Sequence, residues 1–532
     1  MKYYADMREY IGFLESKGKL IRIKREINKD LELHPLVRWQ FRGLAEKDRK
    51  AFLFENVIDA AGKKYDIPVL VAAHAPSTEI YAMAMNCEPD QILEKWADSE
   101  RNPIPPKMVA AGPVQEEIHV GDSLLEHGGM GEFPVPISTP GFDSAPFLTA
   151  GNWVTKDPDT GIINVANHRA MVKAPLRLGC LADQSQHIRI HWEKYRRKGS
   201  PTMPAAIVIG PPPNVGLVAT AKVPYESDEY HVAGGMAGSP LELVKCQTID
   251  LEVPASAEIV LEGHVPTDQL ETEGPFGEFP GYMGMGGPNL YMDITCITHR
   301  KRPIFNAFLS QFPTSESSTL RGVSGDGTFY KFLKYDLSIS SIKEVFFHRE
   351  SGARPFCVLC FQNPRKAEVW SALKGADALA PGHIKMIIAV DDDIDPKDAD
   401  SVIWALGYRM QPHRDMLITN PSKTSGLDPS VAPPEEMRKR GPTAHYGSTV
   451  LIDATRKWDY PPVSLPTKEL MERAKKIWEE EGLPPLTPKK PWYGYPLGYW
   501  KDEDQEDAER ALRGEHYLTG EKHARNRVKP RK

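Results

Sequence analysis

The middle of this 532-residue chain carries a strand pattern that restricts the possible folds. Between about residues 145 and 310, short apolar runs such as 205–209, 259–261 and 291–297 alternate with turn residues. Runs this short and this rich in Val and Ile are typical of strands and are too short for buried helices. The pattern predicts a β-rich core, of the barrel or sandwich kind, in the middle of the protein.

Helices and strands alternate on both sides of this core. Met7, Ile11 and Leu14 have helical spacing, and residues 20–24 alternate as a strand does. After residue 330, helical segments alternate with strands such as 383–390, which predicts a βαβ unit with a partly parallel sheet. The chain exceeds the size of a single core, so we expect several domains. We place them at residues 1–120, 121–325 and 326–460, followed by a Pro-, Trp- and Tyr-rich strap and charged tail over 461–532.

Composition excludes several classes of protein. The net charge of -6 disfavours a nucleic-acid partner, and no apolar run approaches the length of a membrane span. The N-terminus lacks the pattern of a signal peptide, so we expect a cytoplasmic protein. Six cysteines in so long a chain do not form a disulfide framework, and we interpret Cys357 and Cys360 as buried strand residues. The acidic run 391–393 could bind a metal ion, but residues 395–398, which follow it, are typical of the capped, acidic start of a helix. We therefore favour a structural role for this run.

Two glutamates, Glu273 and Glu278, lie five residues apart in a stretch broken by Gly274, Pro275 and Gly277. Such a stretch cannot form a regular helix, so the two carboxylates are free to converge on one point. A converging pair beside a cation is typical equipment for proton transfer. Without that cation, a solvated surface loop or a turn is the commoner explanation of such a pair.

Polar residues also interrupt the apolar strand pattern over residues 164–172. Strict alternation would send Asn164 and His168 to one face of the strand and Arg169 to the other. Either a bulge interrupts the strand, or these side chains belong to two different sites. His187 and His191 are four residues apart, as in zinc proteases, but Ile188 stands where the protease glutamate belongs. One His joined by Asn and Glu oxygens would instead suit manganese or magnesium.

Several ordered blocks together resemble the UbiD family of reversible decarboxylases, which use prenylated flavin mononucleotide (prenylated FMN). These blocks are residues 164–172, 186–188, 228–230, 238–246, 254–263, 273–278 and 452–455. The resemblance implies an α/β (α+β) fold: a split β-barrel flavin domain between an N-terminal α/β segment and a C-terminal α/β oligomerisation domain. It also implies a homo-oligomer, dimer or hexamer, that depends on a flavin prenyltransferase for its cofactor.

The family's site residues transfer to matching positions of this chain. A divalent ion, usually Mn²⁺, would bind Asn164, His187 and Glu229, with Glu242 a weaker alternative to Glu229, and K⁺ would bind near residues 219–222. The catalytic network would be Arg169, Glu273 and Glu278, which supplies the missing cation. The residues around the cofactor would be Asn164, Ala166, His168, Arg169, Gln186, His187 and Glu229.

The resemblance leaves the substrate open. Arg321 takes a position that is apolar in relatives acting on cinnamate-like acids, which favours an aromatic acid with a second anionic or thioester group, such as phthaloyl-coenzyme A. A surface arginine before a Gly-rich turn at 324–327 is the alternative. His445 is a second candidate for the substrate pocket. The expected activity is non-oxidative decarboxylation of an aromatic or heteroaromatic acid. The alternatives are a carboxylating subunit acting on a phenol derivative, a non-catalytic structural subunit, or a conventional flavin reductase.

Overall fold

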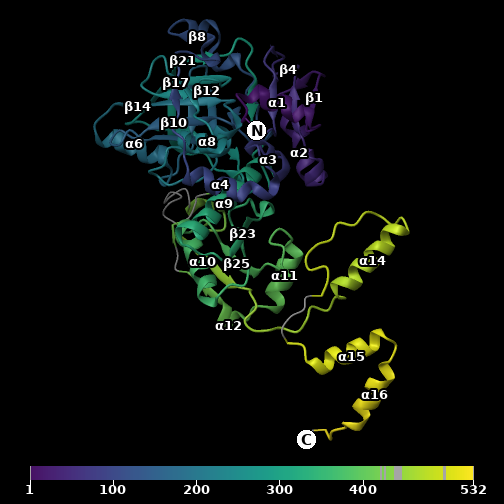
Figure 1. The fold of residues 1–532 in the computed structure, drawn as a ribbon. Helices are drawn as coiled ribbons and strands as arrows, with labels where there is room; N and C mark the ends of the chain where they lie inside the picture. Colours follow the sequence, from purple (N-terminus) through teal and green to yellow (C-terminus); the bar gives the residue numbers. More distant parts are fainter. Residues whose placement is uncertain (1, 420–421, 424–426, 437–445, 495–498, 531–532) are drawn as a thin grey trace.

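The computed structural model describes residues 2–419, 422–423, 427–436, 446–494 and 499–530. Three α/β units follow one another along the chain, and a helical extension leaves the last of them (Figure 1). This arrangement confirms the mixed α/β fold class expected from the sequence.

The N-terminal unit is a four-stranded sheet covered by helices. Its first helix, α1 (Met7–Ser16), begins at Asp6, whose side chain accepts hydrogen bonds from the backbone N–H groups of Arg8 and Glu9. The sheet runs in the order β1 (Leu20–Ile23), β3 (Ala51–Phe54), β6 (Val69–Val71) and β22 (Phe305–Ala307). The edge strand β22 comes from far along the chain and pairs with β6 in parallel. The other helices are α2 (Leu33–Gly43), α3 (Thr78–Met85) and α4 (Ile92–Arg101).

The central unit is built on a ten-stranded, mainly antiparallel sheet. Its main path ends at β11 and β9, so the sheet stays open rather than closing into a barrel. The strands along the path are β11 (Ile163–Asn167), β10 (Asn152–Lys156), β14 (Thr202–Ile209), β17 (Ile259–Pro266), β21 (Gly287–His299), β13 (Arg177–Cys180), β12 (Ala170–Ala174) and β9 (Phe147–Leu148). Strands β8 (Glu117–Val120) and β18 (Glu271–Glu273) pair with β21 off this path.

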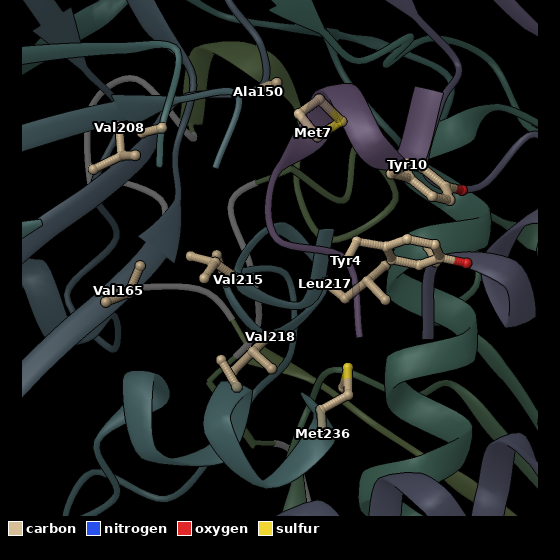
Figure 2. Packing of buried hydrophobic residues seen from close by; sticks show 14 of the residues in the cluster. Tyr4, Met7, Tyr10, Ala150, Val165, Val208, Val215, Leu217, Val218 and Met236 are labelled. Carbon is tan, nitrogen blue, oxygen red and sulfur yellow. The ribbon is translucent and has the colours of Figure 1, made fainter. Parts of the chain in front are cut away.

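A shared apolar core joins the N-terminal and central units. Sheet residues such as Val165 and Val208 face α7 (Pro213–Val218) and α8 (Glu229–Ala237), and Met7 and Tyr10 of α1 complete the cluster (Figure 2). Short two- and three-stranded ladders surround this core. They consist of β2 (Ile27–Asn28), β4 (Val57–Ile58) and β5 (Lys64–Tyr65); β7 (Lys107–Met108), β15 (Glu242–Lys245) and β16 (Glu252–Pro254); and β19 (Phe276–Gly277) with β20 (Met283–Gly284).

The C-terminal unit has the partly parallel sheet expected from the sequence. Strands β24 (Phe356–Phe361), β25 (Met386–Asp391) and β29 (Val450–Asp453) are parallel, and β23 (Ile342–Phe347) and β26 (Met416–Ile418) flank them antiparallel. Cys357 and Cys360 are buried on β24, as predicted. The helices are α9 (Glu316–Lys331), α10 (Lys366–Leu379), α11 (Ala399–Tyr408) and α12 (Pro412–Asp415), and β27 (Ser422–Lys423) pairs with β28 (Tyr446–Gly447).

Residues 324–327 do not form a turn, which corrects the alternative considered for Arg321. They lie inside α9, and the glycines of this helix provide room for neighbours. A Cβ atom at Gly327 would lie 2.5 Å from Trp96 Cβ, and one at Gly322 would lie 2.1 Å from the guanidinium of Arg349. Close packing therefore explains the glycine pattern.

The acidic run 391–393 has a structural role, as favoured from the sequence. Asp391 and Asp393 both pair with the buried Arg409, at 3.1 and 2.6 Å. Asp398 caps α11 by accepting a hydrogen bond from the Ser401 backbone N–H.

The chain ends in an extension that has few contacts with the body (Figure 1). It carries α14 (Lys468–Glu480), α15 (Asp502–Leu512) and α16 (His516–Arg525), and none of their described residues is buried. Within the described part of the chain, no helix combines the length and the apolar character that crossing a membrane requires.

Candidate active site

A cavity of about 530 Å³ opens between the central and C-terminal units. Its wall on the central side comes from the end of β11, the start of α6 (His187–Arg197) and residues 276–282. Helix α9 and residues 351–355 and 382–385 form the opposite wall. Nearly all the residues singled out from the sequence line this space.

Arg169 connects the two glutamates of the broken loop. Its Nε donates to Glu273 Oε1 at 2.8 Å and its Nη2 to Glu273 Oε2 at 2.7 Å, while Nη1 donates to Glu278 Oε1. The three side chains are only 6%, 1% and 9% exposed. Burial opposes the charge on Arg169, but Glu278 and Glu273 outweigh it and raise the Arg169 pKa. The network is thus a buried, charge-assisted cluster in which Glu278 and Arg169 face the cavity and Glu273 lies behind them.

The backbone around the glutamates leaves space for the arginine. Gly274 has φ +85°, a conformation that side-chain-bearing residues rarely adopt. A Cβ atom at Gly284 would come within 3.2 Å of Arg169 Nη1. Asp143 fixes the segment by accepting a 2.9 Å hydrogen bond from Gly277 N. Burial raises the pKa of Asp143 to about 6, although bonds from backbone N–H groups and the charge of Arg169 oppose the rise.

A second group of polar side chains lies at the end of β11 and the start of two helices. His187 Nδ1 is 3.1 Å from Asn164 Oδ1, and Glu229 Oε2 accepts a 2.9 Å hydrogen bond from Val165 N. Burial raises the pKa of Glu229 to about 8, because only backbone N–H groups oppose it. Asn164 Nδ2 is buried with no hydrogen-bond partner among the described residues. An amide, an imidazole and a carboxylate with unsatisfied capacity fit a divalent cation.

The strand containing these residues breaks where alternation would have separated them. Strand β11 ends at Asn167 and β12 begins at Ala170, so His168 and Arg169 lie in the connection between them. Asn164, Ala166, His168 and Arg169 therefore all line one cavity. The sequence left open a bulge or two separate sites; the structure instead ends one strand and begins another, and the residues share one site.

The wall on the α9 side is cationic. Four basic side chains line the cavity: Lys222, Arg321, Arg354 and His383. Burial, followed by the charge of Arg321, lowers the pKa of Arg354 to about 10. Burial and these same cations lower the pKa of His383 to about 4. Within the described ranges, no carboxylate forms an ion pair with Arg321, Arg354 or Lys222. This wall is suited to an anionic group of a ligand.

The remaining expected residues fall into three groups. Gln186 and the stretch 219–222 line the cavity, as expected. Glu242 does not: it is exposed on β15 and pairs with Lys107 at 2.8 Å, so it cannot replace Glu229. His445 lies outside the described residues.

Asp183 and Arg354 also line the cavity, although no sequence pattern singles them out. Burial, followed by the charge of Glu278, raises the Asp183 pKa. No motif marks either residue, because each reaches the cavity through folding of a separate segment.

Comparison with known proteins identifies the class. Three family models match in sequence order, all described as 3-octaprenyl-4-hydroxybenzoate carboxy-lyase: the N-terminal domain over residues 11–100, the Rift-related domain over 107–312 and the C-terminal domain over 318–454. The chain belongs to the UbiD family of carboxy-lyases, as its resemblance suggested.

The similar proteins include characterised enzymes. The chain is 30% identical over 450 residues to the phenolic acid decarboxylase of Sedimentibacter hydroxybenzoicus, covering 81% of this chain and 90% of that one. An uncharacterised protein of Aquifex aeolicus is 31% identical over 512 residues, covering 90% and 99%. One similar solved structure is the UbiD-class enzyme HmfF from Pelotomaculum thermopropionicum, in an evolved dimeric form complexed with prenylated FMN. Its TM-score is 0.74 at 29% identity, and the match covers 89% of this chain and 100% of that one. The closed vanillic acid decarboxylase of S. hydroxybenzoicus has a TM-score of 0.77 at 27% identity, covering 90% and 100%.

Proposed function

We propose that this protein decarboxylates an aromatic or heteroaromatic carboxylic acid with prenylated FMN bound in the cavity. The observation that carries the proposal is the buried Arg169 bound to both Glu273 and Glu278, with Glu278 at the cavity wall. The relatives support it, since one is a phenolic acid decarboxylase and another was solved with prenylated FMN.

Asn164, His187 and Glu229 would hold the divalent ion, Mn²⁺, that anchors the cofactor phosphate. The stretch 219–222 would contribute oxygens to K⁺, and Ala166, His168 and Gln186 would contact the cofactor or substrate. The orphaned Asn164 Nδ2 and His168 Nε2, both buried, fit a ligand with several acceptor atoms. When bound, prenylated FMN supplies an acceptor for the electron pair left on carbon as CO₂ departs.

The chain's own residues would position the substrate and move the proton. Arg169 keeps its charge in the buried network and orients both carboxylates. Glu278 faces the cavity and would deliver a proton to the carbon that has lost CO₂, then regain one from solvent. Glu273, behind Arg169, holds the guanidinium in place with two hydrogen bonds.

We further propose that the substrate carries a second anionic or thioester group, as phthaloyl-coenzyme A does. Arg321 packs over the Phe279 ring at 4.2 Å and shares the cationic wall with Arg354. These cations favour a ligand that brings its own negative charge. The carboxylating direction on a phenol derivative uses the same site. A non-catalytic structural subunit is disfavoured because the whole charged network is intact.

Native mass spectrometry and the ultraviolet-visible spectrum test the cofactor. The protein should be produced together with a flavin prenyltransferase and supplied with Mn²⁺ and K⁺. We expect the mass of prenylated FMN plus a divalent ion, and we expect His187→Ala to lose both. A folded wild-type protein that carries no flavin, or only unmodified FMN, would contradict the proposal.

A matched substrate pair tests the second group. Turnover of an aromatic monoacid and of the corresponding dicarboxylate or aryl thioester should be measured for wild type and Arg321→Met. Loss of a charge-assisted hydrogen bond costs about 1.5–3 kcal/mol, so kcat/KM for the anionic substrate should fall by roughly 10- to 150-fold more than for the monoacid. Equal losses of kcat/KM for both substrates would show that Arg321 does not select the substrate.

A further inference from the structure

Three histidines and a glutamate gather far from the cavity. His119 lies on β8, His127 follows the short helix α5 (Ser123–Glu126), Glu132 ends the turn η4 (Gly129–Glu132), and His299 ends β21. None of the four lines the cavity. Strands β8 and β21 lie at the end of the central unit away from the C-terminal unit (Figure 1).

The fold brings the ligand atoms of three of these residues within reach of a single ion and places His299 beside two of them. One side-chain donor atom each from His119, His127 and Glu132 lies within 4.8 Å of the other two. His299 Nε2 is 2.9 Å from His119 Nε2 and 3.5 Å from Glu132 Oε1. On the sheet, His119 pairs with Ile297, so His299 is its diagonal neighbour on the same face.

A glycine turn returns the chain to this face. Gly128 and Gly129 have φ values of +84° and +55°. A Cβ atom at Gly129 would lie 2.3 Å from Pro175 O, so this position does not tolerate a side chain. The turn thereby brings Glu132 back beside the two strands.

The hydrogen bonds around the group leave lone pairs facing its centre. His299 Nδ1 is 2.7 Å from Arg300 O, a carbonyl that can only accept, so Nδ1 carries the proton. In this tautomer the Nε2 atom of His299 presents its lone pair to His119 and Glu132. A backbone carbonyl that fixes the tautomer in this way is typical of metal-binding histidines. Glu132 Oε2 is buried without a hydrogen-bond partner among the described residues.

We propose that His119, His127, Glu132 and His299 form a structural Zn²⁺ site. Ligands at about 2.0–2.2 Å in a tetrahedron lie roughly 3.4 Å apart, which matches the 3.5 Å contact and requires the 2.9 Å contact to open slightly. A chain of hydrogen bonds through His119, His299 and Glu132 is the alternative. It leaves Glu132 Oε2 unsatisfied and gives His127 only a ring contact with His119, at 4.0 Å between centroids. Four protein ligands close the coordination shell, so the ion would fasten the edge strand β8 and the following turn to β21.

Zinc retention by the tag-free full-length protein tests the site. The protein should be stripped with EDTA, loaded with ZnCl₂ and desalted, and its zinc content measured by plasma mass spectrometry. We expect His127→Ala and Glu132→Ala each to lose about one equivalent relative to wild type. His413→Ala, an exposed histidine on α12, should lose none. His187→Ala changes a residue of the cavity, so this variant should keep the one equivalent of zinc that His127→Ala loses.

Cobalt gives a second readout that separates the two sites. Co²⁺ bound by four nitrogen and oxygen ligands absorbs visible light much more strongly than six-coordinate Co²⁺. The strong bands should appear in wild type and His187→Ala and be absent from His127→Ala. Circular dichroism of the metal-free variants should match wild type, because His127 is exposed. Equal zinc retention in His127→Ala and His413→Ala, or loss of the cobalt bands only in His187→Ala, would overturn the proposal.

Discussion

Replacing Arg169 with Met should both destabilise the central unit and abolish turnover. The substitution removes three hydrogen bonds to carboxylates and leaves Glu273, 1% exposed, without its counter-ion. Removing one partner of a buried ion pair costs about 3–5 kcal/mol. For a domain of this size, 1 kcal/mol shifts the melting temperature by about 2–4 °C, which predicts a loss of roughly 6–20 °C.

The matched control is Arg196→Met, the same substitution in an exposed pair. Arg196 lies 3.8 Å from Glu193 and its side chain is 60% exposed. Such pairs contribute about 0–1 kcal/mol, so its melting temperature should change by no more than roughly 4 °C. Differential scanning fluorimetry of both metal-free proteins measures the shifts, and product formation from the best aromatic acid measures turnover. If Arg169→Met melts within the range of the control and remains active, the buried network is neither a structural nor a catalytic requirement.

Three further predictions concern single positions. Glu278→Gln should fold as wild type and lose at least roughly 100-fold in kcat, because the amide cannot deliver a proton; turnover near wild type would exclude Glu278 as the acid. Burial raises the Asp143 pKa to about 6, so the contribution of Asp143 to stability is fully present below about pH 4 and is lost as the pH rises through about 6. Between these pH values, the free energy of unfolding of wild type should fall by about 3 kcal/mol relative to Asp143→Asn, as measured by chemical unfolding. Parallel pH profiles for the two proteins would refute the shift. Gly327→Ala should destabilise the protein by about 1–3 kcal/mol in thermal unfolding, because the added Cβ would collide with Trp96. The control Gly407→Ala, whose Cβ would have no neighbour within 4 Å, should be neutral or stabilising. Similar shifts for both variants would show that Trp96 moves aside.

The sequence predicted the fold well where periodicity and local signals agree. The helical spacing of Met7, Ile11 and Leu14 and the buried strand at Cys357 and Cys360 appear in the structure as predicted. Residues 324–327 do not follow their local signal. Their glycines indicate a turn when taken alone, but packing against Trp96 and Arg349, far away in sequence, gives the same residues a helical role.

The network of Arg169, Glu273 and Glu278 could be proposed from the sequence because a family pattern supplied the partner of the carboxylates. Spacing alone could not join Arg169 to Glu273, since more than one hundred positions separate them. The group around His119 shows the opposite case. Its residues are spread from position 119 to 299 without any metal-binding spacing, and only the pairing of β8 with β21 reveals that they meet.

The parallel edge strand β22 has a consequence for synthesis on the ribosome. Roughly 230 residues separate the end of β6 from β22, so at about 5–20 residues per second the N-terminal sheet lacks its last strand for roughly 10–50 s. During that interval the edge of β6 presents unpaired N–H and C=O groups, which can join strands of other nascent chains. A fragment ending near residue 100 would retain this open edge permanently. The delay between these two strands therefore exposes the nascent chain to edge-to-edge pairing however stable the finished protein is.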